Sequence, residues 1–266
     1  MLLRCEKLAE PMAAAISGID LNDALAAAVR AALQDALHES LVLCIRDQRL
    51  APAAFREAMR SFGTPVVRTQ LAQHPQCREV NIISSEDRDE LGDGKRLVNG
   101  AHWHTDDSFM REPCSLTMLY GVEIPSSGGD TQFSNMYMAY ADLPAARRRC
   151  IDGLKVVHKY NSSRKGTRVA SLSVQAMAAM TDAIHPLVRT HPETGVGPST
   201  SIPIAWKLWW DLSAARARSC WTSSRRMRRS KSISTGIAGV AAISSSGTIA
   251  APCTRQMPTI PRRRSA

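Results

Sequence analysis

Two residues in the segment Trp103–Phe109 could bind a metal ion together. His104 and Asp106 lie two positions apart, and residues at that spacing on a β-strand point to the same face of the sheet. An imidazole and a carboxylate placed in this way provide two ligands of a two-histidine, one-carboxylate site. Such a site leaves positions open on Fe(II) for a cosubstrate and oxygen. His104 and Asp106 are therefore candidates for two of the ligands of such a site.

The spacing alone is weak evidence for this chemistry. With seven histidines in the chain, a His-x-Asp tripeptide arises by chance in roughly one such sequence in three. His102 lies close by, and we do not assign it to the site. The residues around the pair make the assignment specific.

The segment around His104 resembles the metal-binding strand of the taurine and 2,4-dichlorophenoxyacetate dioxygenases, the TauD/TfdA family. About 25 residues further on, Gly128–Phe133 matches the Gly-Gly-Asp-Thr strand of that family. The resemblance covers about residues 10–195 with the motifs in the right order. The other matching segments are Leu43–Gln48, Phe62–Gly63, Met136, Ala139–Tyr140, Leu143–Pro144 and His185–Gly195.

This resemblance implies a mainly β protein with flanking helices, built as a double-stranded β-helix (jelly-roll). It implies Fe(II) held by His104 and Asp106, with 2-oxoglutarate and O2 as cosubstrates. Thr131 is expected to hydrogen-bond a carboxylate of 2-oxoglutarate, and a strand threonine with a satisfied hydroxyl is the alternative. His185 and His191 are expected to be structural. The metal and cosubstrate would supply the oxidative chemistry, while the protein supplies position and a dry cavity.

Short strands and a few helices must position these residues. Apolar residues at every fourth position predict a helix over 21–37, capped by Asp20 or Asn22. Pro52 opens a second predicted helix that runs to about Phe62. Many short strands favour a jelly-roll or barrel over a doubly wound sheet. Strands are expected at 41–45, 101–105, 115–124, 130–134, 154–160 and 183–190, and a further helix at roughly 135–151.

The charge is divided unevenly along the chain. Residues 1–195 hold 22 Lys and Arg against 23 Asp and Glu, whereas residues 196–266 hold 12 basic residues and one acid, Asp211. The first part is therefore close to neutral and the second carries a charge of +11. Such a break indicates a domain boundary or a change in how the sequence was produced. We divide the chain into a truncated dioxygenase-like domain at 1–195 and a basic tail rich in Arg, Ser and Ala at 196–266.

The tail lacks the second histidine ligand that the family carries in its C-terminal half, because no histidine follows His191. The genetic code offers an explanation. Trp206–Asp211 must be encoded by TGG AAR YTN TGG TGG GAY. The same DNA, read from the third base of the Ala205 codon, gives NTG GAA RYT NTG GTG GGA. This frame encodes a Glu and then Val-Gly, and it resembles the Met-Glu-x-x-Val-Gly segment of the family.

The same shift applied to Ile243–Thr254, with TCN serine codons, is compatible with Asp-Leu-Val-Ile-Trp-Asp-Asn-Arg-Cys-Thr-Met-His. That segment resembles the second-histidine motif of the family. We therefore predict that residues from about Val196 onward are an out-of-frame translation and poorly ordered, with the C-terminal strands missing or non-native. The codon of the missing ligand would span Cys253 and Thr254. A real basic tail is the alternative.

Two classes of function follow from these observations. The first is an Fe(II)- and 2-oxoglutarate-dependent dioxygenase that hydroxylates a small organic acid. Asn161–Arg164 resembles the Asn-Ser-Arg stretch of aryloxyalkanoate members, which favours an aryloxyacetate-like substrate over taurine or another sulfonate. The second class is a non-catalytic dioxygenase-like domain whose basic tail contacts nucleic acid. The near-neutral body makes nucleic acid the less expected partner.

Composition also bears on the location of the protein. No stretch approaches 18 apolar residues, so no membrane partner or span is expected. Seven cysteines, an odd number without a Cys-x-x-Cys pair, indicate reduced thiols and a cytoplasmic protein. Assembly into a homo-oligomer, which is common in the family, is left open.

Overall fold

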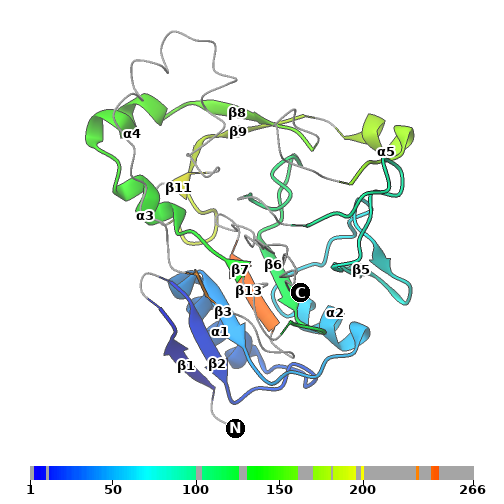
Figure 1. Ribbon diagram of the computed structural model, residues 1–266. Coiled ribbons are helices and arrows are strands. Elements are labelled where there is room, and N and C mark those ends of the chain that lie inside the picture. The colour runs from blue at the N-terminus through cyan, green and yellow to red at the C-terminus, as the bar shows by residue number, and fades with distance from the viewer. Residues whose placement is uncertain are drawn as a thin grey trace, which may run out of the picture.

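The structure, a computed structural model, is built mainly of short strands with helices at their flanks (Figure 1). This agrees with the predicted mainly β class. The residues that the structure describes are 3–9, 12–99, 104–125, 131–160, 170–180, 182–195, 199–200, 232–233 and 241–245.

A five-stranded sheet forms the lower part of the molecule in Figure 1. Its strands lie in the order β1 (Arg4–Lys7), β2 (Ala14–Ser17), β3 (Val42–Ile45), β13 (Ala241–Ser245) and β6 (Leu116–Tyr120). β2 and β3 are parallel, and the other neighbours are antiparallel. A strand from far along the chain, β13, therefore lies between β3 and β6.

Helix α1 (Ala27–Ser40) begins later than the helix predicted over 21–37. Asp20 accepts hydrogen bonds from the backbone and side-chain nitrogens of Asn22, at 2.9 and 2.8 Å. These residues thus form a turn of their own, which competes with helix capping. The helix begins without a side-chain cap and ends at Leu41, whose left-handed backbone (φ 62°) closes the last turn.

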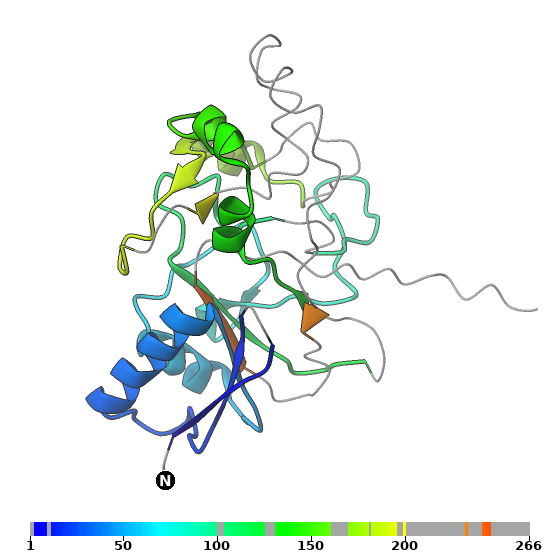
Figure 2. The same ribbon diagram turned by 90° about the vertical axis from the view of Figure 1, so that its left-hand side faces the viewer.

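Helix α2 (Pro52–Arg60) agrees with its prediction, because Pro52 occupies the first turn, where its missing N–H is not needed. α1 and α2 lie on the same side of the five-stranded sheet (Figure 2) and share one core with β2, β3 and β6. Leu33 and Leu43 are fully buried in this core. Truncating such a leucine to alanine lowers the free energy of unfolding by about 2–5 kcal/mol. Met118 of β6 packs in the same core, which therefore anchors this strand.

Two helices replace the single helix predicted over 135–151. They are α3 (Met136–Ala141) and α4 (Ala145–Ile151), and Pro144 stands at the N-cap of α4. Proline has no N–H to continue a helix, so the chain breaks before it. These helices lie beside the antiparallel pair of β8 (Lys155–His158) and β9 (Ala183–Pro186) in the upper part of Figure 1. The other short elements are β4 (Gln73–His74), β5 (Cys77–Asn81), β7 (Thr131–Gln132), α5 (Val174–Ala179) and β10 (Val188–Arg189).

Three short strands belong to the predicted tail. They are β11 (Ser199–Thr200), β12 (Ser232–Ile233) and β13, and they pair with β10, with β7, and with β3 and β6 respectively. Residues 196–198, 201–231, 234–240 and 246–266 lie outside the described residues. The boundary at 195/196, the disorder of the tail and the non-native state of its strands stay predictions.

The described residues contain no helix long and apolar enough to cross a membrane. Cys5, Cys44, Cys77 and Cys114 carry free thiols. Cys150, by contrast, is disulfide-bonded. The prediction of reduced thiols throughout the chain is therefore wrong at Cys150.

Candidate metal centre

His104 and Asp106 converge, although no strand brings them together. His104 and Thr105 belong to no strand, residues 101–103 lie outside the described residues, and a turn follows at 106–109. The strand predicted over 101–105 is thus wrong at its described end. The carboxylate of Asp106, the first residue of this turn, nevertheless lies against the imidazole of His104.

The distance between the two side chains suits a shared metal ion. His104 Nε2 lies 3.1 Å from Asp106 Oδ1. Two ligands that bind one ion at about 2.1 Å and at right angles are about 3 Å apart. Both side chains remain partly exposed, at 40% and 21%, so an ion could reach them. Their donor atoms therefore fit two neighbouring positions of an iron site.

The surroundings of Asp106 favour its ionised form. Burial opposes ionisation, but the hydrogen bond and charge of His104 outweigh it, with help from Thr117 and Arg68. The pKa of the Asp106 carboxyl is therefore held below its ordinary value. Thr117, on β6, donates a hydrogen bond from Oγ1 to Asp106 Oδ2 at 2.8 Å. A carboxyl group binds a metal ion in its ionised form, so these contacts favour metal binding by Asp106.

A buried ion pair supports the turn that carries Asp106. Arg68 Nη2 lies 2.7 Å from Asp107 Oδ2, and both side chains are largely buried. Burial raises the pKa of Asp107 against the opposing charge of Arg68. The same guanidinium donates to Cys114 Sγ at 3.1 Å, and burial raises the pKa of Cys114 to about 11, which keeps it a thiol. Sequence reasoning missed Arg68, Cys114 and Thr117, because no motif marks them.

The third ligand is not found in the described part of the chain. No group of three His, Cys, Asp or Glu side chains among the described residues could hold a metal ion. His185 Nε2 is engaged with the Met110 carbonyl oxygen at 2.9 Å, and its ring meets that of His158 edge-on at 5.3 Å. His102 lies outside the described residues. The assignment of His104 and Asp106 stays a prediction that this geometry supports.

Thr131 occupies β7 and is half-buried. Its backbone pairs with Ile233 of β12, and Gly128–Asp130 of its motif lie outside the described residues. Among the described contacts, no hydrogen bond or ion pair joins Thr131 to His104 or Asp106. Its role toward 2-oxoglutarate therefore also stays a prediction.

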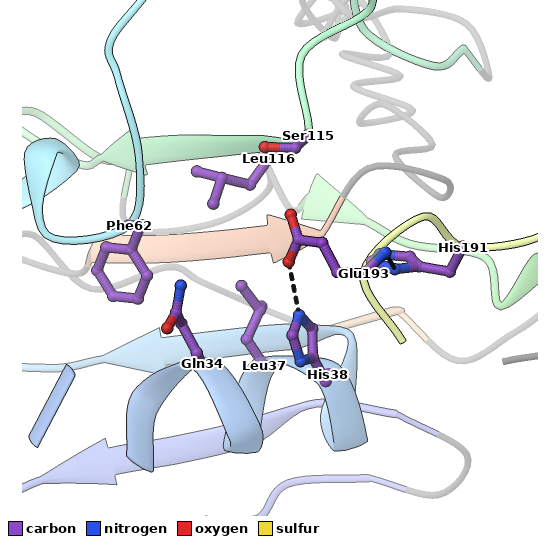
Figure 3. Close-up of a pocket in the computed structure, with 8 residues that line it drawn as sticks. All are labelled: Gln34, Leu37, His38, Phe62, Ser115, Leu116, His191 and Glu193. Atoms are coloured by element: carbon purple, nitrogen blue, oxygen red, sulfur yellow. Dashed lines mark hydrogen bonds and ion pairs between the residues drawn. The ribbon is translucent and has the colours of Figure 1, made fainter. Parts of the chain in front are cut away.

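A pocket at a different place lies between α1, the start of β6 and the segment after β10 (Figure 3). Two of the residues that line it, His38 and Glu193, are in contact, with 3.0 Å between His38 Nε2 and Glu193 Oε2. His191 Nδ1 accepts from the backbone N–H groups of Glu193 and Thr194, both at 3.3 Å, and its ring meets that of His38 edge-on at 5.6 Å. The contact between His38 and Glu193 joins residues 155 positions apart, so no local sequence pattern could predict it.

We expect His191 to make the protein less stable in acid. Burial, with the charges of His38 and Arg189, holds the pKa of His191 below its ordinary 6.5, against the opposing effect of Glu193. As the pH falls through 6.5, the unfolded chain binds a proton that the folded chain resists. The free energy of unfolding should therefore decrease until the pH falls below the folded-state pKa. Urea unfolding between pH 8 and pH 5 measures this loss.

The control is His191→Asn, whose amide oxygen can still accept from the two N–H groups but does not titrate. This variant should lose less stability than the parent over the same pH range. Equal losses in the two proteins would show that His191 does not contribute to the acid sensitivity.

Comparison with known proteins identifies the family of the chain and agrees with its fold. The family model described as "Taurine catabolism dioxygenase TauD, TfdA family" matches residues 4–204. The chain therefore belongs to the TauD/TfdA family. A crystal structure of a taurine dioxygenase from Burkholderia xenovorans has a TM-score of 0.70 and 26% identity, covering 94% of this chain and 82% of that one. The predicted jelly-roll fold class is thus confirmed.

Curated relatives are similar over the same region. The alkylsulfatase of Acinetobacter baylyi is 30% identical over 204 residues, which are 73% of this chain and 61% of the relative. The alpha-ketoglutarate-dependent 2,4-dichlorophenoxyacetate dioxygenase of Cupriavidus pinatubonensis is 30% identical over 194 residues, which are 69% and 67%. The matched region thus spans about three fifths to two thirds of the length of these relatives.

Proposed function

We propose that this chain carries the iron-binding part of an Fe(II)- and 2-oxoglutarate-dependent dioxygenase that hydroxylates a small organic acid. The observation that carries the proposal is the convergence of His104 Nε2 and Asp106 Oδ1 at 3.1 Å in a chain of the TauD/TfdA family. When bound, iron would couple the oxidative decarboxylation of 2-oxoglutarate to oxidation of the substrate. A cytoplasmic location and assembly into a homo-oligomer stay predictions from the sequence.

In this proposal each residue has a defined task. His104 and Asp106 hold the ion, and the surroundings of Asp106 favour the carboxylate form that binds it. Thr131 orients 2-oxoglutarate by a hydrogen bond to one of its carboxylates. Arg68 holds the 106–109 turn through its ion pair with Asp107.

Among substrates we propose an aryloxyacetate-like carboxylate ahead of taurine or another sulfonate. Two kinds of relative support this range, since one is named for 2,4-dichlorophenoxyacetate and another for sulfonates. Asn161–Arg164, which favours the first, lies outside the described residues.

A substrate panel tests this function. The protein is incubated with Fe(II), 2-oxoglutarate and either 2,4-dichlorophenoxyacetate, taurine or an alkyl sulfate, and succinate release is measured. Faster release with taurine than with the aryloxy acid would reverse the ranking. Release that Asp106→Asn leaves unchanged would contradict the proposed centre.

We further propose that 1–195 is the dioxygenase domain and that the chain from about Val196 is an out-of-frame translation. The position of β13 supports this. It is Ala-Ala-Ile-Ser-Ser, yet it lies between two strands, where β-branched and apolar residues are favoured. With TCN codons for Ser244–Ser246, the shifted frame reads HTC, NTC and NTC. The first of these codons encodes Phe, Leu or Ile, and the other two encode Phe, Leu, Ile or Val. The alternative frame thus supplies the residues that this position favours.

The charge of +11 in residues 196–266 favours a second candidate, a dioxygenase-like domain with a nucleic-acid-binding tail. Fluorescence anisotropy with labelled DNA at rising salt separates the two candidates. DNA binding that weakens with salt and is lost on deletion of 196–266 would favour the binding module. Iron-dependent succinate release would favour the enzyme.

A further inference from the structure

The two oxygens of the Asp106 carboxylate have different neighbours. Oδ1 lies 3.1 Å from His104 Nε2, and Oδ2 accepts the hydroxyl hydrogen of Thr117 at 2.8 Å. A carboxylate whose two oxygens are free can rotate, or can bind an ion through both of them. Here the hydrogen bond engages Oδ2 and leaves Oδ1 directed to the side of His104.

Thr117 is well placed to hold this carboxylate still. It lies within β6, whose five residues pair with β13, and the adjacent Met118 is buried in the main core. The backbone of Thr117 is therefore fixed by both hydrogen bonds and packing. A β-branched side chain on such a backbone has little freedom at χ1, so its hydroxyl has a defined direction.

A second set of contacts connects the same strand to the turn. Arg68 pairs with Asp107 and donates to Cys114 Sγ, and Cys114 Sγ lies 3.7 Å from Thr117 Oγ1. Asp107 has a left-handed backbone, with φ 50°, which is costly for a residue other than glycine. The buried ion pair with Arg68 offsets that cost and keeps Asp106 within reach of Thr117.

We propose that Thr117 is a positioning residue of the metal centre: its hydroxyl occupies Asp106 Oδ2, so that only Oδ1 is presented to an ion shared with His104. This inference rests on the proposed function. It assigns Thr117 no contact with the ion and no part in the reaction. Hydrogen bonds to ligating carboxylates fix their orientation, and losing such a partner typically weakens metal binding about 10–100-fold.

The test measures metal binding without catalysis. The full chain and its variants are titrated with Mn(II), and the free ion is followed by its electron paramagnetic resonance signal. Thr117→Val keeps the shape of the side chain but removes the hydroxyl, so its Kd for Mn(II) should rise about 10-fold or more. Thr117→Ser restores the hydroxyl and should bind within a few-fold of the parent. If Thr117 acted through packing alone, Thr117→Ser would raise the Kd more than Thr117→Val, because valine keeps the methyl group that serine lacks.

Two controls separate the possible failures. Thr190→Val makes the same change at an exposed position and should leave the Kd unchanged, while Asp106→Asn should weaken binding more than Thr117→Val. Equal Kd values for the parent and Thr117→Val would overturn the positioning role and leave the metal centre intact. A parent that does not bind Mn(II), or binds it as well after Asp106→Asn, would overturn the metal centre and the positioning role with it.

Discussion

Restoring the alternative reading frame from about codon 196 should raise 2-oxoglutarate turnover by at least about 100-fold. A single-base insertion near the codon for Gly195 makes this change, because every later codon then begins at the former third base. The expected gain exceeds the 10–100-fold effect of residues that only support a ligand, since the insertion would supply a ligand itself. Succinate release, measured with Fe(II) in excess, gives the result.

Two physical effects act together in this prediction. The described residues hold no third His, Cys, Asp or Glu to complete a metal site with His104 and Asp106, so bound iron would be labile. The shifted frame is compatible with a histidine at the codon that spans Cys253 and Thr254, which is the ligand that the hypothesis requires. It also places apolar residues at β13, which would strengthen the pairing with β3 and β6. The restored chain should therefore be more soluble as well as more active.

A two-base insertion at the same place is the matched control, because it changes the tail equally but opens the third frame. It should restore neither turnover nor solubility. Resequencing the gene across Thr194–Val196 checks the premise directly. If the DNA is as written and the 266-residue product turns over 2-oxoglutarate at ordinary rates, the out-of-frame hypothesis is wrong. The third ligand would then have to be sought at His185 or His191, and whichever of them binds the ion would have to leave its present contacts.

The second large effect is expected at the metal ligands. His104→Ala or Asp106→Ala should weaken Fe(II) binding by more than about 100-fold, which is beyond the range for residues that only support a ligand. Each change removes one of the two side-chain donors in the centre, and a single ligand holds an ion poorly. Equilibrium dialysis of Fe(II) under anaerobic conditions measures the affinity of each variant.

His102→Ala is the control for these variants, because it removes a histidine two positions from His104 that we do not assign to the site. Its affinity for Fe(II) should match that of the parent. If His104→Ala and Asp106→Ala both bind iron as tightly as the parent, the two-ligand assignment is wrong. If His102→Ala is the variant that loses iron, the histidine ligand has been misassigned.

Several features of this protein follow from the sequence alone. The family could be identified from short motifs, because each depends on residue types at a fixed spacing, and the family model confirms it over residues 4–204. The start of α2 could be predicted because Pro52 acts on the backbone locally. Two helix predictions had wrong bounds because the effect of a nearby residue was overlooked. Pro144 divides the helix predicted over 135–151, and the turn at Asp20 delays the start of α1.

Other features depend on contacts between distant segments, and only the tertiary structure shows them. The pair of His104 and Asp106 was predicted for a strand, yet the two side chains meet in a segment without a strand, just where a turn begins. The contact of Thr117 with Asp106 spans 11 residues, that of Arg68 with Cys114 spans 46, and that of His38 with Glu193 spans 155. The position of β13 between β3 and β6 likewise depends on pairing between segments that are far apart in the sequence. Local sequence records which chemistry is available, whereas packing decides which groups meet, because the free energy of such contacts depends on the whole core that holds them.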